Sequence, residues 1–449
     1  MKNRYMNKYK IYFWALTVSM GGFLFGMDTA LISGVEQTVQ KLWNLSDTIT
    51  GQMVAMALYG TIIGALTGGI PAERLGRKKA LLVIALVYFI SALGSALAPN
   101  IVSLMLFRFL GGLSVGASSV VAPMYIAEIS PRENRGKLTA LFQFNIVFGI
   151  MVAYFSNWLI GATSNPEAWR WMLGIEVIPA VLFIALIPYV PESPRWLILK
   201  KGDREKALSI LKIINPHSAE GLLADIVKSG KIKKIVGLRR FFSTEYASPI
   251  LLVFLFAAFN QLSGINAVIY YAPRIFASSG MAVESALLSS VGIGITNIIF
   301  TMLGLVFIDR MGRKFLMYAG SIGYIISLGL ISVVFREDYQ GSAYVLPVLL
   351  FLFIAAHAIG QGAVIWVFIS EIFPNKVRYW GSSFGSGVHW VFAALIAGNF
   401  PYFAGKFGQS YIFGFFTLMM VLQLIFVWKM MPETKGISLE EIENQMRKK

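Results

Sequence analysis

The feature of this sequence that most constrains its fold is a series of long apolar runs along the whole chain. Each run has about 18–25 residues, enough for a helix to cross the ~30 Å hydrocarbon layer of a bilayer. A bilayer core offers no hydrogen bonds to the backbone, so such segments form helices. Twelve runs begin near Ile11, Gly51, Ala80, Ile101, Ala140, Met172, Pro249, Ala286, Phe315, Tyr344, Phe384 and Tyr411. We therefore predict an all-α membrane protein with twelve transmembrane helices.

Composition agrees with this prediction and excludes several other classes of protein. Of 449 residues, 56% are hydrophobic and 14% are charged, whereas soluble domains have about 25% charged residues. The sequence has no cysteine, which excludes disulfides, thiol catalysis and thiolate metal sites. It has no P-loop motif for ATP, and we expect no cofactor and no metal. The first apolar run continues as a full span, so we interpret it as the first helix and not as a signal peptide.

The net charge of +16 reflects membrane topology more than an acidic partner. When the N-terminus is placed in the cytoplasm, nearly every Lys and Arg falls on that side, as the positive-inside rule requires. The other side keeps Lys41, Arg170, Arg274, Arg336 and Lys406. Attraction to the lipid bilayer is a secondary effect of this charge, and nucleic-acid binding is not expected. We expect a multi-pass protein of the plasma membrane, and the compact loops favour the inner membrane of a bacterium. Both termini should be cytoplasmic.

Three sequence blocks occur twice, about half the chain apart. Residues 73–78 return as 309–314, Glu128 with Arg135 returns as Glu371 with Arg378, and residues 191–195 have a weaker echo in 432–436. Two six-helix halves in the same orientation explain this spacing, an architecture of transporters with a site at the membrane midplane. The predicted parts are an amino-terminal half (1–198), a linker of short amphipathic cytoplasmic helices (199–245), a carboxyl-terminal half (246–431) and a tail (432–449).

The repeated blocks place carboxylates beside arginines at the cytoplasmic ends of spans. Arginine alone would serve as a topology signal, so the repeated Glu favours ion pairs that lock a cytoplasmic gate. Partly buried pairs cost energy and often serve a switch or a register. The predicted gate residues are Arg77, Glu128, Arg135, Glu192, Arg195, Arg313, Glu371, Arg378 and Glu433.

Three ionisable residues lie deep inside predicted spans: Asp28, Arg108 and Glu176. Each costs about 2.5 kcal/mol or more in a bilayer, so each requires a partner and a function. All three are in the amino-terminal half. We therefore expect this half to handle protons and the other half to bind the solute.

Uncharged polar and aromatic residues in the spans suit a small polar solute without charge. Amides offer donors and an acceptor together, and aromatic faces cover the apolar side of a ring. The predicted substrate-binding residues are Gln143, Asn260, Gln261, Asn266, Asn297, Trp366, His389 and Trp390, with Phe25, Tyr270 and Tyr271 lining or gating the cavity. For a single amide the alternative is a hydrogen bond between helices. Glycines in the second and fourth spans, among them Gly60, Gly64, Gly69 and Gly116, allow close packing of helices.

Several motifs resemble those of the sugar porter family of the major facilitator superfamily. They are residues 21–28, Arg108 before Gly111 and Gly112, and residues 191–197, 261–271 and 432–436. The resemblance covers essentially the whole chain, and the full set in this order is specific to the family.

The resemblance implies a function for the buried residues. In proton-coupled members of the family an Asp at the position of Asp28 pairs with an Arg at that of Arg108, whereas passive glucose facilitators typically have Asn. Gln143, Gln261, Asn266, Asn297 and Trp366 match the sugar-contacting positions. We expect transport of a hexose or pentose by alternating access, in symport with a proton through Asp28 and Arg108. Glu176 is a weaker candidate for an accessory acid, or part of a local hydrogen-bond network.

Other functions remain open from the sequence. If Asp28 and Arg108 form a permanent ion pair, the chain is a facilitative sugar or polyol uniporter. A non-transporting sugar receptor is an alternative of another class. The chain lacks a constellation for nucleophilic or metal catalysis, so we do not expect an enzyme. One chain encloses the whole site, so a monomer suffices.

The sequence also departs from the usual family pattern near the expected pocket and gate. Asn260 stands where a Gln is common, and His389 replaces an amide beside Trp390. Ala363 follows Gly362, where the family usually has Gly-Pro. Ile150 is Gln in the xylose symporter, and residues 378–381 replace the usual Arg-Gly step. The identity of the sugar therefore stays open.

Overall fold

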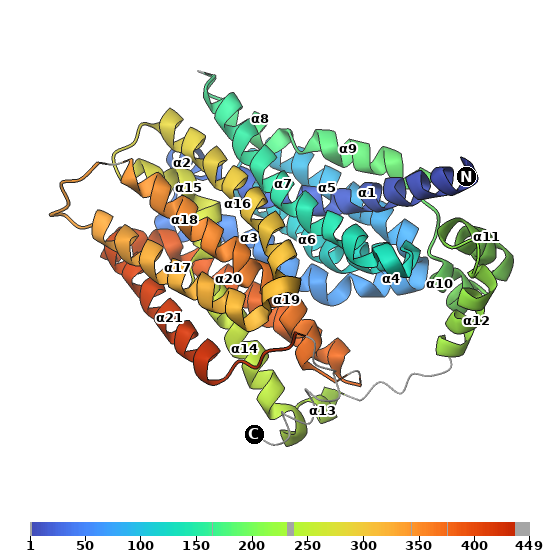
Figure 1. The fold of residues 1–449 in the computed structure, drawn as a ribbon. Coiled ribbons are helices and arrows are strands. Elements are labelled where there is room, and N and C mark those ends of the chain that lie inside the picture. Colours follow the sequence, from blue (N-terminus) through green and yellow to red (C-terminus); the bar gives the residue numbers. More distant parts are fainter. Residues whose placement is uncertain (1, 164, 231–237, 343, 375, 436–449) are drawn as a thin grey trace. The chain divides into compact units, whose positions relative to one another are not determined.

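All the regular secondary structure in the described part of the chain is helical. A computed structural model describes residues 2–163, 165–230, 238–342, 344–374 and 376–435, and these residues contain no strand (Figure 1). Residues 231–237 of the predicted linker and 436–449 of the predicted tail lie outside the described residues. The predicted all-α fold class is confirmed.

Eleven segments of the described chain are long and apolar enough to cross a membrane. They are Tyr9–Gly34, Asp47–Thr67, Arg77–Ala96, Ile101–Ile129, Arg135–Gly161, Ala168–Tyr189, Thr244–Ala277, Val283–Met311, Arg313–Val334, Val345–Ile372 and Gln409–Lys429. The remaining predicted span is α20 (Arg378–Phe407), whose 30 residues are long enough. Its glycines, serines and histidine make it more polar than the others. A more polar helix is expected where a span faces other protein and not lipid.

The helices form two compact units. Unit 1 comprises Met1–Asp28, Tyr59–Ile150 and Leu173–Lys234. It contains most of α1 (Lys2–Leu31), parts of α3 (Asp47–Thr67) and α7 (Arg135–Gly161), and α4 (Gly69–Leu75), α5 (Arg77–Ala96), α6 (Ile101–Ile129), η2 (Arg132–Asn134), α9 (Val177–Leu186), η3 (Ile187–Tyr189), α10 (Pro194–Trp196), η4 (Leu197–Lys201), α11 (Arg204–Ile214) and α12 (Ala219–Gly230). Short helices α11 and α12 fall within the residue range predicted for the linker.

Unit 2 comprises Thr29–Leu58, Met151–Met172 and Ile235–Lys449. It holds η1 (Ile32–Gly34), α2 (Glu36–Leu42), most of α8 (Ala168–Gly174), α13 (Leu238–Phe241), η5 (Thr244–Tyr246), α14 (Ala247–Leu262), α15 (Ile265–Ala277), α16 (Val283–Met311), α17 (Arg313–Val334), α18 (Val345–Ile359), α19 (Gln361–Ile372), α20 and α21 (Gln409–Lys429). The division into two six-helix halves, a linker and a tail stays a prediction.

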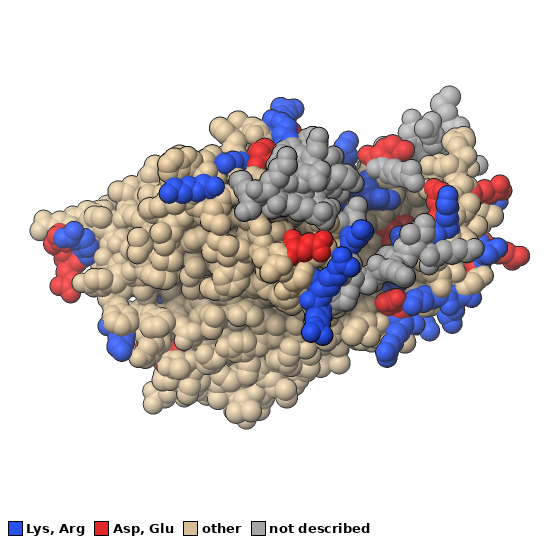
Figure 2. Space-filling view, turned by 90° about the horizontal axis from the view of Figure 1, so that it is seen from below, with Lys and Arg blue, Asp and Glu red and all other residues tan. Residues whose placement is uncertain are grey.

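The outer faces of the spans are apolar, as a lipid environment requires. On α5, Val83, Leu86, Ile90 and Leu93 recur every three or four residues and are 39–49% exposed. Such spacing places them on one face of the helix, while Tyr88 on another face is buried. Figure 2 shows wide uncharged stretches of surface, with the charged side chains gathered in groups. An apolar helix face of this size is stable in lipid and would be a liability in water.

Glycines allow α3 and α6 to pack backbone against backbone within unit 1. A Cβ atom added at Gly60 would lie 2.1 Å from the carbonyl oxygen of Phe109, and one at Gly64 would lie 2.2 Å from that of Leu113. From the other side, a Cβ at Gly116 would lie 2.2 Å from the carbonyl oxygen of Thr61. Helices in membranes gain stability from such close approach, since lipid tails are as apolar as their side chains.

Replacing Gly64 by Val should therefore separate α3 from α6. The added side chain meets a backbone oxygen that cannot turn away, and overpacking of this kind costs about 1–3 kcal/mol or more. We expect a lower melting temperature for the purified protein in detergent and a smaller yield of folded protein. The matched control is Gly69→Val, since a Cβ at Gly69 meets nothing within 4 Å. Equal melting temperatures for the two variants would contradict the packing argument.

Candidate functional site

A buried ion pair joins two helices of unit 1. Arg108 Nη1 on α6 donates to Asp28 Oδ1 on α1 at 2.9 Å, and the two side chains are 2% and 7% exposed. Gly111, one turn further along α6, lies beside this pair and packs closely against Ser91 of α5. A Cβ there would lie 2.5 Å from Ser91 Oγ and 3.5 Å from Asp28 Oδ1. The structure thus brings together the Asp and the Arg that the sequence predicted as partners.

Several polar atoms beside this pair have no hydrogen-bond partner among the described residues. They are Arg108 Nε and Nη2 and one carboxyl oxygen of Glu176, all buried. Glu176 precedes α9 and lies near enough for the charges of Asp28 and Arg108 to act on it. An unsatisfied buried polar group costs about 1–3 kcal/mol. One arginine with two free donor groups therefore stands beside two carboxyl groups, an arrangement that allows alternative pairings.

An amide cluster in unit 2 is centred on Gln261, at the end of α14. Its Nε2 donates to Asn260 Oδ1 at 2.9 Å and lies 3.2–3.3 Å from the ring nitrogens of His389. Its Oε1 accepts from Asn266 Nδ2 at 3.0 Å. The break between α14 and α15 at Gly264, where φ is +82°, turns the chain so that residues on both sides share this cluster. Only glycine adopts such a φ without strain.

Aromatic rings extend the amide cluster. The ring centroid of His389 lies 5.0 Å from that of Trp366 and 4.8 Å from that of Trp390, the latter with perpendicular planes. Trp390 is buried, whereas Trp366 on α19 is 40% exposed and presents a free aromatic surface. The structure thus brings together Asn260, Gln261, Asn266, Trp366, His389 and Trp390.

The other predicted binding and cavity residues have separate surroundings. Asn297 on α16 is buried and accepts from the Thr301 hydroxyl at 3.2 Å. Tyr271 is buried on α15, where its hydroxyl donates to the carbonyl oxygen of Ala397 at 2.8 Å, and Tyr270 beside it is also buried. Gln143 on α7 and Phe25 on α1 belong to unit 1. Their part in the sugar site stays a prediction.

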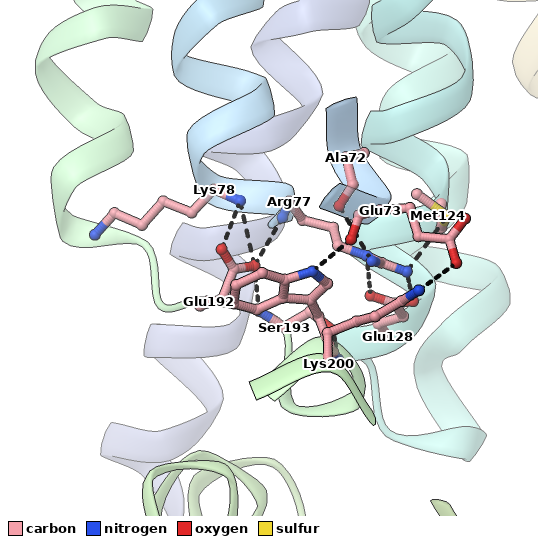
Figure 3. Close-up of polar contacts among 10 residues, drawn as sticks. Ala72, Glu73, Arg77, Lys78, Met124, Glu128, Glu192, Ser193 and Lys200 are labelled. Atoms are coloured by element: carbon pink, nitrogen blue, oxygen red, sulfur yellow. Dashed lines mark hydrogen bonds and ion pairs between the residues drawn. The ribbon is translucent and has the colours of Figure 1, made fainter. Parts of the chain in front are cut away.

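An ion-pair network in unit 1 is centred on Arg77, the first residue of α5 (Figure 3). Its guanidinium forms a bidentate ion pair with Glu128, with N–O distances of 3.0 and 2.9 Å. Its backbone N–H donates to Glu192 at 2.9 Å, as does that of Lys78 at 3.2 Å. Gly76, with φ of +99°, permits this approach, because a Cβ there would lie 2.3 Å from Glu192 Oε2. We call Arg77, Glu128 and Glu192 the Arg77 network.

The same arrangement recurs in unit 2. Arg313 bonds Glu371 at 3.1 and 2.8 Å, and the backbone N–H groups of Arg313 and Lys314 both donate to Glu433 at 3.0 Å. Gly312, with φ of +88°, takes the place of Gly76. We call Arg313, Glu371 and Glu433 the Arg313 network. The repeated sequence blocks therefore correspond to repeated geometry. Each has a bidentate Arg–Glu pair and a second Glu that caps the helix beginning at the arginine.

Three of the predicted gate residues lie outside these networks. Arg135 is exposed and Arg195 is partly exposed, and neither forms an ion pair with another described residue. Arg378 donates to the carbonyl oxygen of Phe373 at 3.3 Å, and its buried Nε has no partner among the described residues. A gating function stays a prediction for all nine of the predicted gate residues.

The sequence reasoning missed another buried ion pair. Glu36 on α2 is fully buried and accepts from Arg274 on α15, both within unit 2. Arg274 also bonds Gln40, and Asp47 lies 3.8 Å away. Burial raises the pKa of the Glu36 carboxyl above its ordinary value, although Arg274 opposes this shift. No motif or spacing signals the pair, because 238 positions separate the partners.

This fold and these sites define a class of protein, a multi-pass membrane transporter built from repeated helical blocks. The chain belongs to the sugar transporter family: residues 14–446 match the family model described as sugar (and other) transporter. It is 36% identical to a D-xylose transporter of Levilactobacillus brevis, over 98% of this chain and 96% of that protein. It is 37% identical to the glucose transporter GlcP of Staphylococcus epidermidis, over 99% and 98%. It is 34% identical to the D-xylose-proton symporter of Escherichia coli K12, over 99% and 97%.

Solved structures agree with this assignment. The inward open conformation of the xylose transporter XylE from E. coli matches with a TM-score of 0.86 and 32% identity, over 97% of this chain and 99% of that one. XylE bound to 6-bromo-6-deoxy-D-glucose matches with a TM-score of 0.80 and 33% identity, over 98% and 100%. The major facilitator fold and the resemblance found in the sequence are thus confirmed. The chain is a transporter and not an enzyme.

The Arg313 network makes the stability of the protein depend on pH through Glu433. Burial alone would raise the pKa of this carboxyl, but four backbone N–H groups outweigh burial and hold the pKa below its ordinary value. A depressed pKa contributes stability that is fully present above the ordinary value of about 4.3 and is lost as pH falls through the folded value. We expect Glu433→Gln to lower the melting temperature at pH 7, and the difference from wild type to shrink below about pH 4.

Melting curves of the purified protein between pH 7 and pH 3.5 would measure this difference. The exposed Glu337 gives a matched control, because Glu337→Gln should leave the difference near zero throughout the range. A Glu433→Gln variant that melts like the wild type at neutral pH would show that the carboxylate does not stabilise the start of α17.

Proposed function

We propose that this chain transports a monosaccharide in symport with protons, by alternating access. Asp28 and Arg108 form the proton-coupling pair, Glu176 is an accessory acid, and the amide and aromatic cluster around Gln261 binds the sugar. The observation that carries the proposal is the buried Asp28–Arg108 pair with unpaired arginine and carboxyl atoms beside it. A pair that served only to hold helices together would be expected to satisfy its donors.

The proton step follows from the geometry of this pair. While Asp28 is ionised, its carboxylate holds Arg108 Nη1 at 2.9 Å and ties α1 to α6. When Asp28 takes up a proton, the charge that holds the guanidinium disappears. Arg108 is then free to turn towards Glu176, whose buried oxygen lacks a partner. A change of pairing biases the packing of the helices, and such a bias is how a bound proton shifts a conformational equilibrium.

The sugar step uses groups without charge. The amide groups of Asn260, Gln261 and Asn266 bond one another in the structure, and they can exchange these bonds for bonds to sugar hydroxyl groups. The 40% exposed ring of Trp366 offers a face for the apolar side of a sugar ring. The proton site and this cluster belong to different units, which supports separate parts for the amino-terminal and carboxyl-terminal helices.

The relatives support a monosaccharide as the substrate. Their names include D-xylose, a pentose, and glucose, a hexose. The name of one relative includes a proton as the coupled ion. We propose that this chain transports a substrate of the same class, a monosaccharide. The alternative is a facilitative uniporter of the same fold, for which the Asp28–Arg108 pair would be structural. A non-transporting sugar receptor would bind sugar without moving it.

The setting of this activity follows from the composition. We propose a bacterial inner membrane, with both termini, the Arg77 network and the Arg313 network on the cytoplasmic side, where the basic residues gather. There the two networks would hold the cytoplasmic helix ends in one state of the transport cycle. The bilayer surrounds the apolar faces, and the protein functions as a monomer.

Replacing Asp28 by Asn separates symport from uniport. Without a titratable group, accumulation of sugar driven by an inward proton gradient should vanish, while exchange of labelled for unlabelled sugar at equal pH continues. Uptake of radiolabelled D-xylose and D-glucose into proteoliposomes measures both. The control is Glu167→Gln, which removes an exposed carboxylate paired with Arg170. Accumulation that persists in Asp28→Asn, or never appears in the wild type, would contradict proton coupling through Asp28.

Replacing Gln261 by Leu tests the sugar site. Leu keeps the size of the side chain but removes the group that bonds Asn260, Asn266 and His389. Each lost hydrogen bond costs about 0.5–1.5 kcal/mol net, so we expect the Kd of the sugar to rise about tenfold. Titration calorimetry with the detergent-purified protein measures it. Asn399→Leu is the control, because Asn399 bonds a backbone oxygen of its own helix. An unchanged Kd in Gln261→Leu would remove this cluster from the site.

A further inference from the structure

The span Val345–Ile372 contains a helix break that no proline causes. Helix α18 ends at Ile359 and α19 begins at Gln361. Gly360 between them has φ of −83° and ψ of −102°, outside the helical region. Sharp breaks usually arise at a proline, but the nearest proline in this span is Pro347, more than three turns before the break. Another interaction must therefore hold the break.

The backbone of α17 lies directly against the break. A Cβ atom added at Gly360 would lie 2.9 Å from the Cα of Gly320, and one added at Gly320 would lie 2.9 Å from the Cα of Gly360. Two residues of α17 close to this contact, Ser321 and Tyr324, are fully buried and polar.

Each of these residues is linked to one side of the break. On the α18 side, the hydroxyl of Tyr324 bonds Nδ1 of His357 at 2.5 Å. On the α19 side, Gln361 Nε2 donates to Gln423 Oε1 on α21, and Gln423 Nε2 donates to Ser321 Oγ at 2.8 Å. We call these five residues the break network. All of them lie within unit 2.

The members on the α19 side have no access to solvent. Gln361, Gln423 and Ser321 are no more than 1% exposed, and Gln361 Oε1 has no partner among the described residues. Burying amides in a helical bundle is unfavourable unless they are hydrogen-bonded. Each of the hydrogen bonds in this network favours the present arrangement, because breaking it would leave further buried polar atoms unpaired. These links therefore favour one angle between α18 and α19 over the alternatives.

The angle at the break determines where the functional side chains of α19 lie. Trp366 follows Gln361 by little more than one turn, and Glu371 of the Arg313 network follows within three turns. A helix of 12 residues moves as a stiff rod. A change in angle at its first residue therefore displaces both side chains together.

We propose that His357 and Gln361 are positioning residues, which hold the α18–α19 break through Tyr324, Gln423 and Ser321 and so place Trp366 and Glu371 for transport. The network performs here the function that a proline performs in other broken helices. Only the expected effect on the KM of transport rests on the proposed function. The geometry of the break is testable without it.

A direct test measures the angle at the break. The chain has no native cysteine, so spin labels can be attached at two introduced ones, Val348→Cys on α18 and Ser370→Cys on α19, both exposed. Pulsed electron resonance then gives the distribution of distances between the labels. We expect a narrow distribution in the labelled parent and a broader or shifted one after Gln361→Leu. An unchanged distribution would overturn the proposal.

A rescue variant distinguishes positioning from simple stabilisation. Ala363 lies in the first turn of α19, where proline is tolerated and imposes a break. Adding Ala363→Pro to Gln361→Leu should restore the narrow distribution. For transport of D-xylose or D-glucose, Gln361→Leu should raise KM about 3- to 10-fold, and Ala363→Pro should return it towards the wild-type value. If the proline restores neither, the network only stabilises the fold and the proposal is wrong.

Two further variants keep the test informative. Gln361→Leu leaves the amide oxygen of Gln423 unpaired, so the double variant Gln361→Leu/Gln423→Leu should be more stable than the single variant. Its distance distribution should still differ from that of the labelled parent. Gln409→Leu at the start of α21 is the matched control, and its distribution and KM should equal those of the wild type. If the wild type itself transports no sugar, the proposed function fails, whereas the distance distributions still decide the inference.

Discussion

Hydrogen-bond satisfaction inside an apolar medium is the constraint on which the rest of this structure depends. Lipid offers no partner to a polar group, so the backbone becomes helical and each polar side chain must find its partner within the protein. Most do so here, as the amides around Gln261 and the Arg77 network show. The buried atoms without partners among the described residues are therefore informative, because each carries an energetic cost. Those of Arg108 and Glu176 stand beside the Asp28 carboxylate, the place proposed to change its charge.

The two polar networks at the starts of α5 and α17 show how a repeated sequence produces repeated geometry. In each, a glycine with positive φ precedes the arginine, and the missing side chain makes space for a carboxylate that caps the helix. The arginine also forms a bidentate ion pair with a glutamate on another helix. Arginine, and not lysine, has the planar fork for this bond. Two copies of one device support the proposal that both networks act in the same way during transport.

What could be predicted from the sequence was what local rules control. The apolar runs predicted the spans, because helix length and bilayer thickness are matched over consecutive residues. Charges in spans need partners, and the family resemblance implied that Asp28 pairs with Arg108. The repeats placed Arg77 and Glu128 among the residues expected to form ion pairs, but they did not indicate which arginine bonds which glutamate. The Glu36–Arg274 pair was missed because its partners come from unrelated positions in the sequence. The break network was also missed, because His357 and Gln361 acquire their function only from the helices packed against them.

The surroundings of two tyrosines at matching positions differ between the two units. Tyr88 and Tyr324 lie at equal distances along the chain from Arg77 and Arg313, and both are fully buried. Around Tyr88 the protein places Asp28 and Glu176, close enough for their charges to act on the ring hydroxyl. The hydroxyl of Tyr324 instead bonds His357, and the next polar groups on α17 and α19 are Ser321 and the amide of Gln361. A group that exchanges protons must be ionisable and tolerate two pairings, whereas a site for a neutral sugar must keep a fixed shape. Hydrogen-bonded neutral groups such as these favour a fixed shape without placing a charge beside Tyr324.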